Sequence, residues 1–237
     1  MDVRRFRADL YELAAKACTD DGPEVRSEVV GIADILVKLY RKNLVKINHS
    51  ALELVCARSL VKQGYDVKVE QRIDSSLVCD VVGMRGDGPL IVEIETGFIP
   101  PQEALEPSAY ARSRIASKIG RYSRFAGKFA LGTTPTYLLD LPEFFVKPPR
   151  ARSLAEAEKI KALTDVRYNK PPISLEELIR ARVHTVFVID VDTGTTQEVD
   201  PETYVSTASA LLHGGRGDAG RRFKSTQAGG KAEIGKS

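Results

Sequence analysis

The 237-residue chain has no tryptophan and only three cysteines. Cys18, Cys56 and Cys79 are odd in number, far apart and surrounded by apolar residues. Their spacing excludes a zinc cluster of the Cys-x-x-Cys type and a disulfide framework. It predicts buried thiols in a reducing compartment.

Common catalytic motifs are also missing. The chain has no P-loop, no GxGxxG and no CxxC motif. Its three histidines, His49, His184 and His213, have no partner histidine at metal-binding spacing. We therefore assign no histidine a catalytic role, and expect His184 in or at the end of a strand.

Long apolar runs are absent as well. No run approaches the ~18 residues needed to span a bilayer, and the basic N-terminus lacks the apolar stretch of a signal peptide. We expect a cytoplasmic protein with no membrane partner. The formal net charge of +3 does not by itself indicate a nucleic-acid binder.

The most informative stretch spans residues 77–95. Two short apolar runs flank the turn-forming residues 85–89, which predicts a β-hairpin. Asp80 lies on the first strand, and Glu93 and Glu95 lie on the second, pointing to one face with Ile94 opposite. Carboxylates inside apolar strands are costly unless they are paired or bind a cation. A hard divalent cation such as Mg²⁺ would satisfy them. The alternative is an ordinary hairpin whose polar face meets water.

Three helices are expected before the hairpin. The first two, at 3–18 and 24–45, would form an N-terminal helical extension (residues 1–47) that caps the core or makes a dimer. The third, at about 50–63, follows the N-cap candidates Asn48, His49 and Ser50, and carries Glu53 at the edge of its buried stripe. A strand at 65–71 leads into the hairpin.

A basic helix is expected after the hairpin, at about 108–126. It carries no acid, and Arg114, Lys118 and Arg121 share one face. This face suggests an anionic ligand between the helix and the acids. The alternative is a solvated helix surface. The residues expected to contact nucleic acid are Arg112, Arg114, Arg121, Tyr122 and Arg124.

The remaining sequence predicts a strand at 127–132, a less regular insertion at about 133–182, a strand at 183–189 and a last helix at about 200–212. We expect the α/β domain to span 48–212. Residues 213–237 are basic and glycine-rich, and we expect a disordered tail. It would either grip a phosphate backbone or only solvate the protein.

The order helix–strand–strand–strand–helix–strand, with Glu53, Asp80, Glu93-Ile-Glu95 and Lys118-xxx-Tyr122 at these places, resembles the PD-(D/E)xK, or restriction-endonuclease-like, nuclease superfamily. It is similar in layout to archaeal Holliday-junction resolvases. The resemblance covers residues 48–132, and residues 183–212 would extend the sheet. It implies an αβββαβ core with a mixed sheet flanked by helices.

The resemblance also implies a site. Asp80, Glu93 and the carbonyl of Ile94 would bind Mg²⁺ or Mn²⁺, and Glu53 would bind a second metal or a metal-bound water. The chain departs from the family pattern at Glu95, where the family has lysine. Either Glu95 acts as a general base, or Lys118 supplies the lysine from the next helix.

Two functions follow as expectations. The first is a metal-dependent DNA nuclease of repair, recombination or defence, forming a homodimer if it cuts both strands. The second is a degenerate member of the superfamily that binds DNA, or acts as a scaffold, without cutting. A third reading is a structural protein whose acids are merely solvated and whose first helices form an oligomer.

Overall fold

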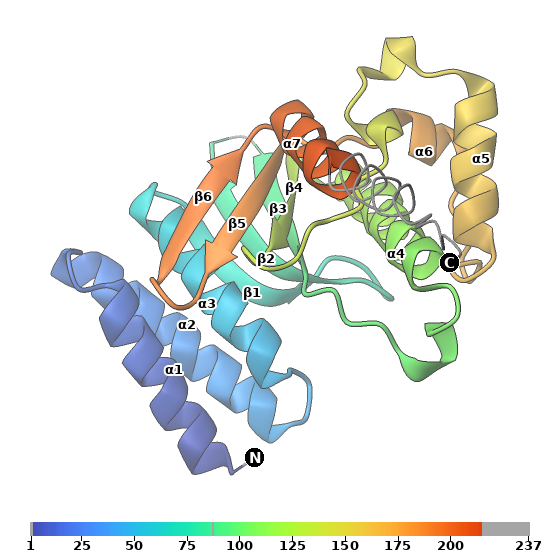
Figure 1. Ribbon diagram of the computed structural model, residues 1–237. Coiled ribbons are helices and arrows are strands. Elements are labelled where there is room, and N and C mark those ends of the chain that lie inside the picture. The colour runs from blue at the N-terminus through green and yellow to red at the C-terminus, as the bar shows by residue number, and fades with distance from the viewer. Residues whose placement is uncertain (1, 87, 215–237) are drawn as a thin grey trace, which may run out of the picture.

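The computed structural model describes residues 2–86 and 88–214. It is an α/β structure in which a six-stranded mixed sheet lies between helices (Figure 1). The predicted α/β class is therefore confirmed. Most of the tail expected at 213–237 lies outside the described residues.

The strands follow one another in space in the order of the sequence. β1, β2 and β3 pair antiparallel, β3, β4 and β5 pair parallel, and β6 returns antiparallel to β5. Their bounds are Asp66–Arg72 (β1), Val78–Arg85 (β2), Gly88–Glu95 (β3), Lys128–Thr133 (β4), Thr185–Asp190 (β5) and Thr195–Val199 (β6).

Seven α-helices are described, and they divide between two cores. The first group packs in one core with one face of the sheet: α1 (Val3–Ala17), α2 (Pro23–Arg41) and α3 (Ile47–Lys62). The second group packs in the other core: α4 (Pro107–Tyr122), α5 (Leu154–Asp165), α6 (Leu175–Arg180) and α7 (Pro201–Gly214).

Alternation along β3 assigns its side chains to the two cores. Leu90, Val92 and Ile94 are buried toward α1–α3, and Ile91 is buried toward α4 and its neighbours. Glu93 and Glu95 contact Lys118 of α4, and so lie on the face opposite Ile94. The prediction that the two glutamates share a face is confirmed.

Several predicted boundaries are wrong. α2 ends at Arg41 rather than Val45, because Asn43 adopts the left-handed backbone conformation with φ of 55°. α3 begins at Ile47, so His49 lies inside the helix and not at its cap. Strand β6 was not expected, and lies between the predicted strand at 183–189 and the predicted last helix.

The insertion at 133–182 contains α5, α6 and short 3₁₀ turns. Its centre is Arg152, only 9% exposed, whose guanidinium donates five hydrogen bonds of 2.5–3.2 Å to backbone carbonyls. These carbonyls belong to Phe145, Lys147, Leu178, Ile179 and Ala181. Arg152 thus joins the chain before α5 to the end of α6.

The three cysteines are buried free thiols, as predicted. His184 precedes β5, and its Nδ1 accepts a hydrogen bond of 3.0 Å from the backbone N–H of Phe129. Within the described ranges, every helix is too short or too polar to cross a bilayer.

Candidate metal centre

The site begins where β2 and β3 separate. Their last registered pair is Val81 with Val92. Beyond it, the Asp80 carboxylate accepts the N–H of Ile94 at 2.6 Å, and the N–H of Asp80 donates to the carboxylate of Glu93 at 3.3 Å. Side-chain oxygens thus replace the ladder bonds and bring both acids into the gap between the strands.

Lys118 enters this gap from α4. Its Nζ lies 3.5 Å from Asp80 Oδ2, 3.1 Å from Glu93 Oε2 and 2.9 Å from Glu95 Oε1. It also donates to the carbonyl of Ile94 at 3.0 Å. The ammonium of Lys118 therefore contacts four oxygens, three from carboxyl groups and one from the backbone. A metal ion at the same place would meet the same oxygens.

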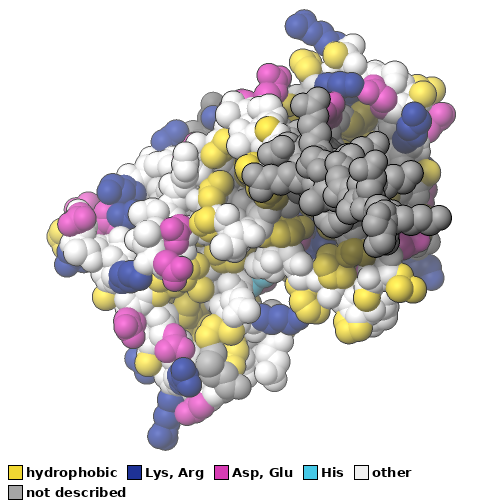
Figure 2. All heavy atoms as spheres, in the orientation of Figure 1, with side chains coloured by type: hydrophobic (Ala, Val, Ile, Leu, Met, Phe, Trp, Pro, Cys, Tyr) yellow, Lys and Arg dark blue, Asp and Glu magenta, His cyan; other side chains and the backbone are white. Residues whose placement is uncertain are grey.

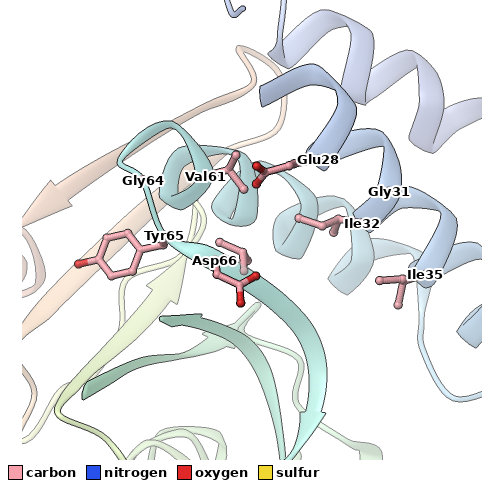
Figure 3. Close-up of a pocket in the computed structure, with 9 residues that line it drawn as sticks. Glu28, Gly31, Ile32, Ile35, Val61, Gly64, Tyr65 and Asp66 are labelled. Carbon is pink, nitrogen blue, oxygen red and sulfur yellow. The ribbon is translucent and has the colours of Figure 1, made fainter. Parts of the chain in front are cut away.

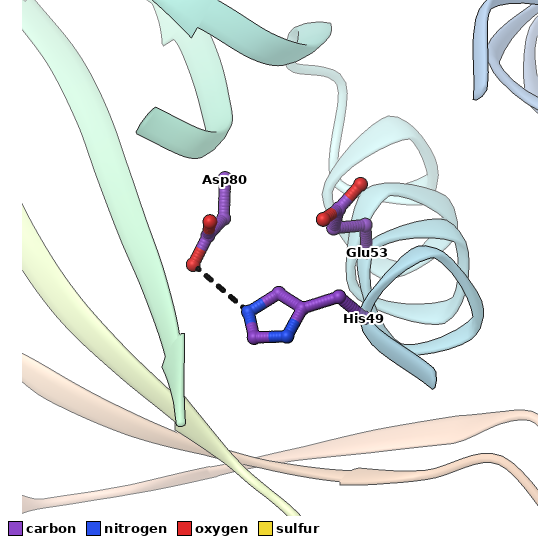
Figure 4. A group of neighbouring side chains, drawn as sticks. All are labelled: His49, Glu53 and Asp80. Atoms are coloured by element: carbon purple, nitrogen blue, oxygen red, sulfur yellow. Dashed lines mark ion pairs between the residues drawn. The ribbon is translucent and has the colours of Figure 1, made fainter. Parts of the chain in front are cut away.

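α3 reaches the same atoms from the opposite face of the sheet. His49 Nε2 lies 3.2 Å from the carbonyl of Ile94 and 3.6 Å from Asp80 Oδ2. Glu53 is one turn further along α3, so both side chains point toward Asp80 of β2 (Figure 4). Single ligand atoms of His49, Glu53 and Asp80 all lie within 4.8 Å of one another. Asp80, near the start of β2, is thus contacted from both layers of helices.

Glu53 is the most unusual group of the site, because it is fully buried. The carboxyl of Glu70 on β1 interacts with it, and apart from this contact its two oxygens have no hydrogen-bond partner among the described residues. Burial, together with the charges of Asp80 and Glu70, raises the pKa of Glu53 to about 10. Glu53 is therefore protonated at neutral pH unless a cation joins it.

Glu70 lies opposite Asp80 on the neighbouring strand. The registered pairs of β1 and β2 flank these two residues rather than include them, and Glu70 has a φ of 49°. Burial and the charge of Asp80 raise the pKa of Glu70. A strained backbone thus holds a further carboxyl beside Glu53.

The two strand acids differ in protonation. Burial opposes ionisation of Asp80, but Lys118, His49 and the N–H of Ile94 lower its pKa to about 2. Burial and the charge of Asp80 raise the pKa of Glu93 to about 8, although Lys118 opposes this shift. Burial would lower the pKa of Lys118, and the surrounding carboxylates raise it well above its usual value. At neutral pH the site therefore contains ionised Asp80, charged Lys118 and a protonated Glu93.

Glu95 is 3% exposed and has two cationic partners, Lys118 and Arg114, whose Nε lies 3.0 Å from Glu95 Oε1. The position at which the superfamily pattern has lysine is thus adjacent to a lysine ammonium from α4.

The basic face of α4 is not the open surface that we expected. Arg114 and Lys118 contact the acids directly, because buried carboxylates require counter-ions. The other residues expected to contact nucleic acid also have partners in the chain: Arg112 pairs with Asp140, Arg121 donates to the carbonyls of Tyr168 and Pro171, Tyr122 donates to the carbonyl of Val78, and Arg124 pairs with Glu177. Arg112 and Arg124 keep about half of their side chains exposed.

Two residues of the site were missed in the sequence. His49 was interpreted as part of a helix cap, although its spacing of four from Glu53 puts both on one helical face. Glu70 gives a weaker signal, because it looks like a solvent-facing residue of an alternating strand. His184 and the cysteines lie outside the cluster.

A hollow of about 500 Å³ lies elsewhere, between α2, the end of α3 and β1 (Figure 3). Its charged wall residues are Glu28 and Asp66, and Ile32 and Ile35 provide apolar surface. Acidic walls would repel a phosphate, so this hollow does not compete with the cluster as a candidate site for a nucleic acid.

No protein-family model, curated protein or solved structure matches the chain.

Proposed function

We propose that the protein is a metal-dependent nuclease that hydrolyses DNA phosphodiester bonds on a restriction-endonuclease-like core, in repair, recombination or defence. The observation that carries the proposal is the convergence on one point of Asp80, Glu93 and the Ile94 carbonyl with Glu53 of α3 and Lys118 of α4. These are the positions that the superfamily resemblance implies.

The donor atoms fit a divalent cation. Asp80 and Glu53 offer carboxylate oxygens, and the buried oxygens of Glu53 lack a partner other than Glu70 within the described chain. His49 adds an imidazole nitrogen. Because Mg²⁺ prefers oxygen ligands and transition metals accept imidazole, this set favours Mn²⁺ over Mg²⁺. The raised pKa values of Glu53 and Glu93 mean that metal binding would release protons.

The residues of the chain would then have distinct roles. A divalent ion lowers the pKa of water and stabilises developing charge on phosphate oxygens. Lys118 carries a positive charge beside the strand acids, where it would orient a phosphate oxygen or water. Glu93, with a pKa of about 8, is mainly protonated at neutral pH and can donate a proton there. Lys118 also donates to the carbonyl of Ile94 and so fixes its position.

A second candidate is a catalytically degenerate protein of the same fold that binds DNA or acts as a scaffold. One observation favours it. Lys118 already contacts Asp80, Glu93 and Glu95 in the folded chain and so supplies an internal counter-charge at the place where an ion would bind. An internal ammonium and a metal would compete for the same oxygens.

The test is cleavage of linear, branched and single-stranded DNA with Mn²⁺ or Mg²⁺. We expect Asp80→Asn and Glu93→Gln to abolish cleavage. Asp140→Asn is the matched control, because Asp140 is a partly exposed acid whose ion pair is with Arg112 and not with a residue of the cluster. Calorimetry should show that Mn²⁺ binds the parent protein with proton release, and that Asp80→Asn does not bind it.

The outcomes separate the two candidates. Cleavage that is lost in both site variants supports a nuclease. Salt-sensitive DNA binding that ignores EDTA, with no product under either metal, supports the degenerate protein. Cleavage that survives in both site variants refutes the assignment of the site.

A further inference from the structure

One large aromatic side chain is exposed beside the cluster. Phe98 lies on the loop between β3 and α4 and is 59% exposed. It follows Glu95 by three residues, so the two Cα atoms are at most about 10 Å apart. A ring of this size in water leaves apolar area that a partner would cover.

Lys46 lies next to this ring. Its Nζ is 5.9 Å from the centroid of Phe98, close enough for a cation–π contact. Lys46 precedes α3 and comes three residues before His49. The ring thus follows the strand that supplies Glu93, and the ammonium precedes the helix that supplies His49 and Glu53.

The backbone beside Phe98 is held in place. Gly97 has a φ of 74°, and a Cβ at this position would lie 2.5 Å from the ring of Tyr137. The carbonyl of Tyr137 in turn accepts a hydrogen bond of 2.8 Å from Thr133 at the end of β4. The ring is therefore presented from an ordered loop, which reduces the entropy lost on binding.

Figure 2 shows hydrophobic side chains and Lys or Arg side chains exposed together on one face of the molecule. An exposed aromatic ring beside an ammonium is the combination that holds an unpaired base and its phosphate, because every base has a face that can stack. A base in a duplex is already stacked on its neighbours and cannot use such a ring.

We propose that Phe98 and Lys46 form a platform on which an unpaired base next to the cluster stacks, so that the substrate class is single-stranded DNA or a DNA end with unpaired nucleotides. This proposal rests on the proposed function, because the cluster would act on the phosphate beside that base. Lys46 would contact a phosphate of the same strand.

The experiment uses the full chain in EDTA, so that no strand is cut, and a single-stranded oligonucleotide containing 2-aminopurine. Stacking on Phe98 should quench the fluorescence of this base. We expect Phe98→Ala to weaken single-strand binding roughly 5- to 150-fold and to abolish quenching. Binding of a blunt duplex should not change.

Two variants and one control sharpen the result. Phe98→Tyr keeps a stacking face and should bind like the parent. Lys46→Met should lower the slope of log affinity against log salt concentration by about 1. The control is Leu154→Ala, because Leu154 has a similar exposed fraction of 57% and lies on α5.

The results distinguish this proposal from the proposed function. Quenching that depends on Phe98, with no cleavage under any metal, supports the platform and refutes the nuclease. Metal-dependent cleavage by a Phe98→Ala variant that binds and quenches like the parent refutes the platform alone. A parent protein that binds no DNA overturns both.

Discussion

Replacement of Lys118 by methionine tests the electrostatics of the cluster directly. The Lys118 side chain is 17% exposed, and its Nζ lies within 3.5 Å of carboxylate oxygens from Asp80, Glu93 and Glu95. Methionine keeps much of the packing of the alkyl chain and removes the charge. The variant therefore leaves three buried acids with one counter-ion fewer.

The magnitude follows from the cost of an uncompensated buried charge. Removal of one partner from a buried ion pair typically costs about 3–5 kcal/mol. In a chain of this size each kcal/mol lowers the melting temperature by about 2–4 °C, so we expect a decrease of about 10 °C. Thermal unfolding in EDTA at pH 8 measures it.

The pH dependence separates this cause from a loss of packing. Burial and Asp80 raise the pKa of Glu93 to about 8, whereas an exposed glutamate titrates near 4.5. Between about pH 4.5 and pH 8, Glu93 therefore keeps a proton in the folded state that it loses in the unfolded state. The free energy of unfolding falls as pH rises through this range. Without Lys118 this pKa rises further. The deficit of the variant should be smaller at pH 5 than at pH 8, and the part that remains at pH 5 comes from Asp80, which loses the counter-ion that keeps its pKa low.

Mn²⁺ provides the second arm of the experiment. If the cluster binds a divalent ion, the ion replaces the missing ammonium, and Mn²⁺ should raise the melting temperature of Lys118→Met more than that of the parent. Lys159→Met, on the exposed surface of α5, is the control for the substitution itself. A variant that melts like the parent in EDTA at both pH values would refute the reasoning.

Two further predictions concern other buried groups. Glu53→Gln should stabilise the metal-free protein by roughly 3 kcal/mol at pH 7, because the parent must take up a proton on folding at a carboxyl whose pKa is raised to about 10. Urea unfolding measures the difference. A variant less stable than the parent would show that Glu53 is not buried as an uncharged carboxyl. Arg152→Met should expose the insertion to limited proteolysis, because five backbone carbonyls lose their donor; cleavage sites spread evenly over the chain would contradict it.

The acids of the hairpin could be predicted because strand alternation is a local property. Glu93 and Glu95 must share a face whatever surrounds them, and Ile94 must face the other core. The position of Asp80 between the strands could not be predicted in this way. It depends on the separation of β2 and β3, where the carboxylate replaces a backbone partner of Ile94.

The basic helix shows why charge patterns mislead about partners. Arg114 and Lys118 indicated an anion, and the structure supplies that anion from the chain's own carboxylates. Sequence separation does not reveal whether two opposite charges will meet or will each face a ligand. Strand β6 was missed for a related reason, because its polar, largely exposed residues resemble a loop when the edge of the sheet is unknown.

The start of α3 has the largest consequence for the chemistry of the site. If the helix began at Ser50, His49 would lie outside its regular backbone, and the acids would form an all-oxygen site suited to Mg²⁺. Because α3 begins at Ile47, His49 and Glu53 are separated by one helical turn and both reach Asp80. A shift of three residues in a helix boundary thus adds a nitrogen donor to the candidate site, and for this reason we propose Mn²⁺ as its preferred ion.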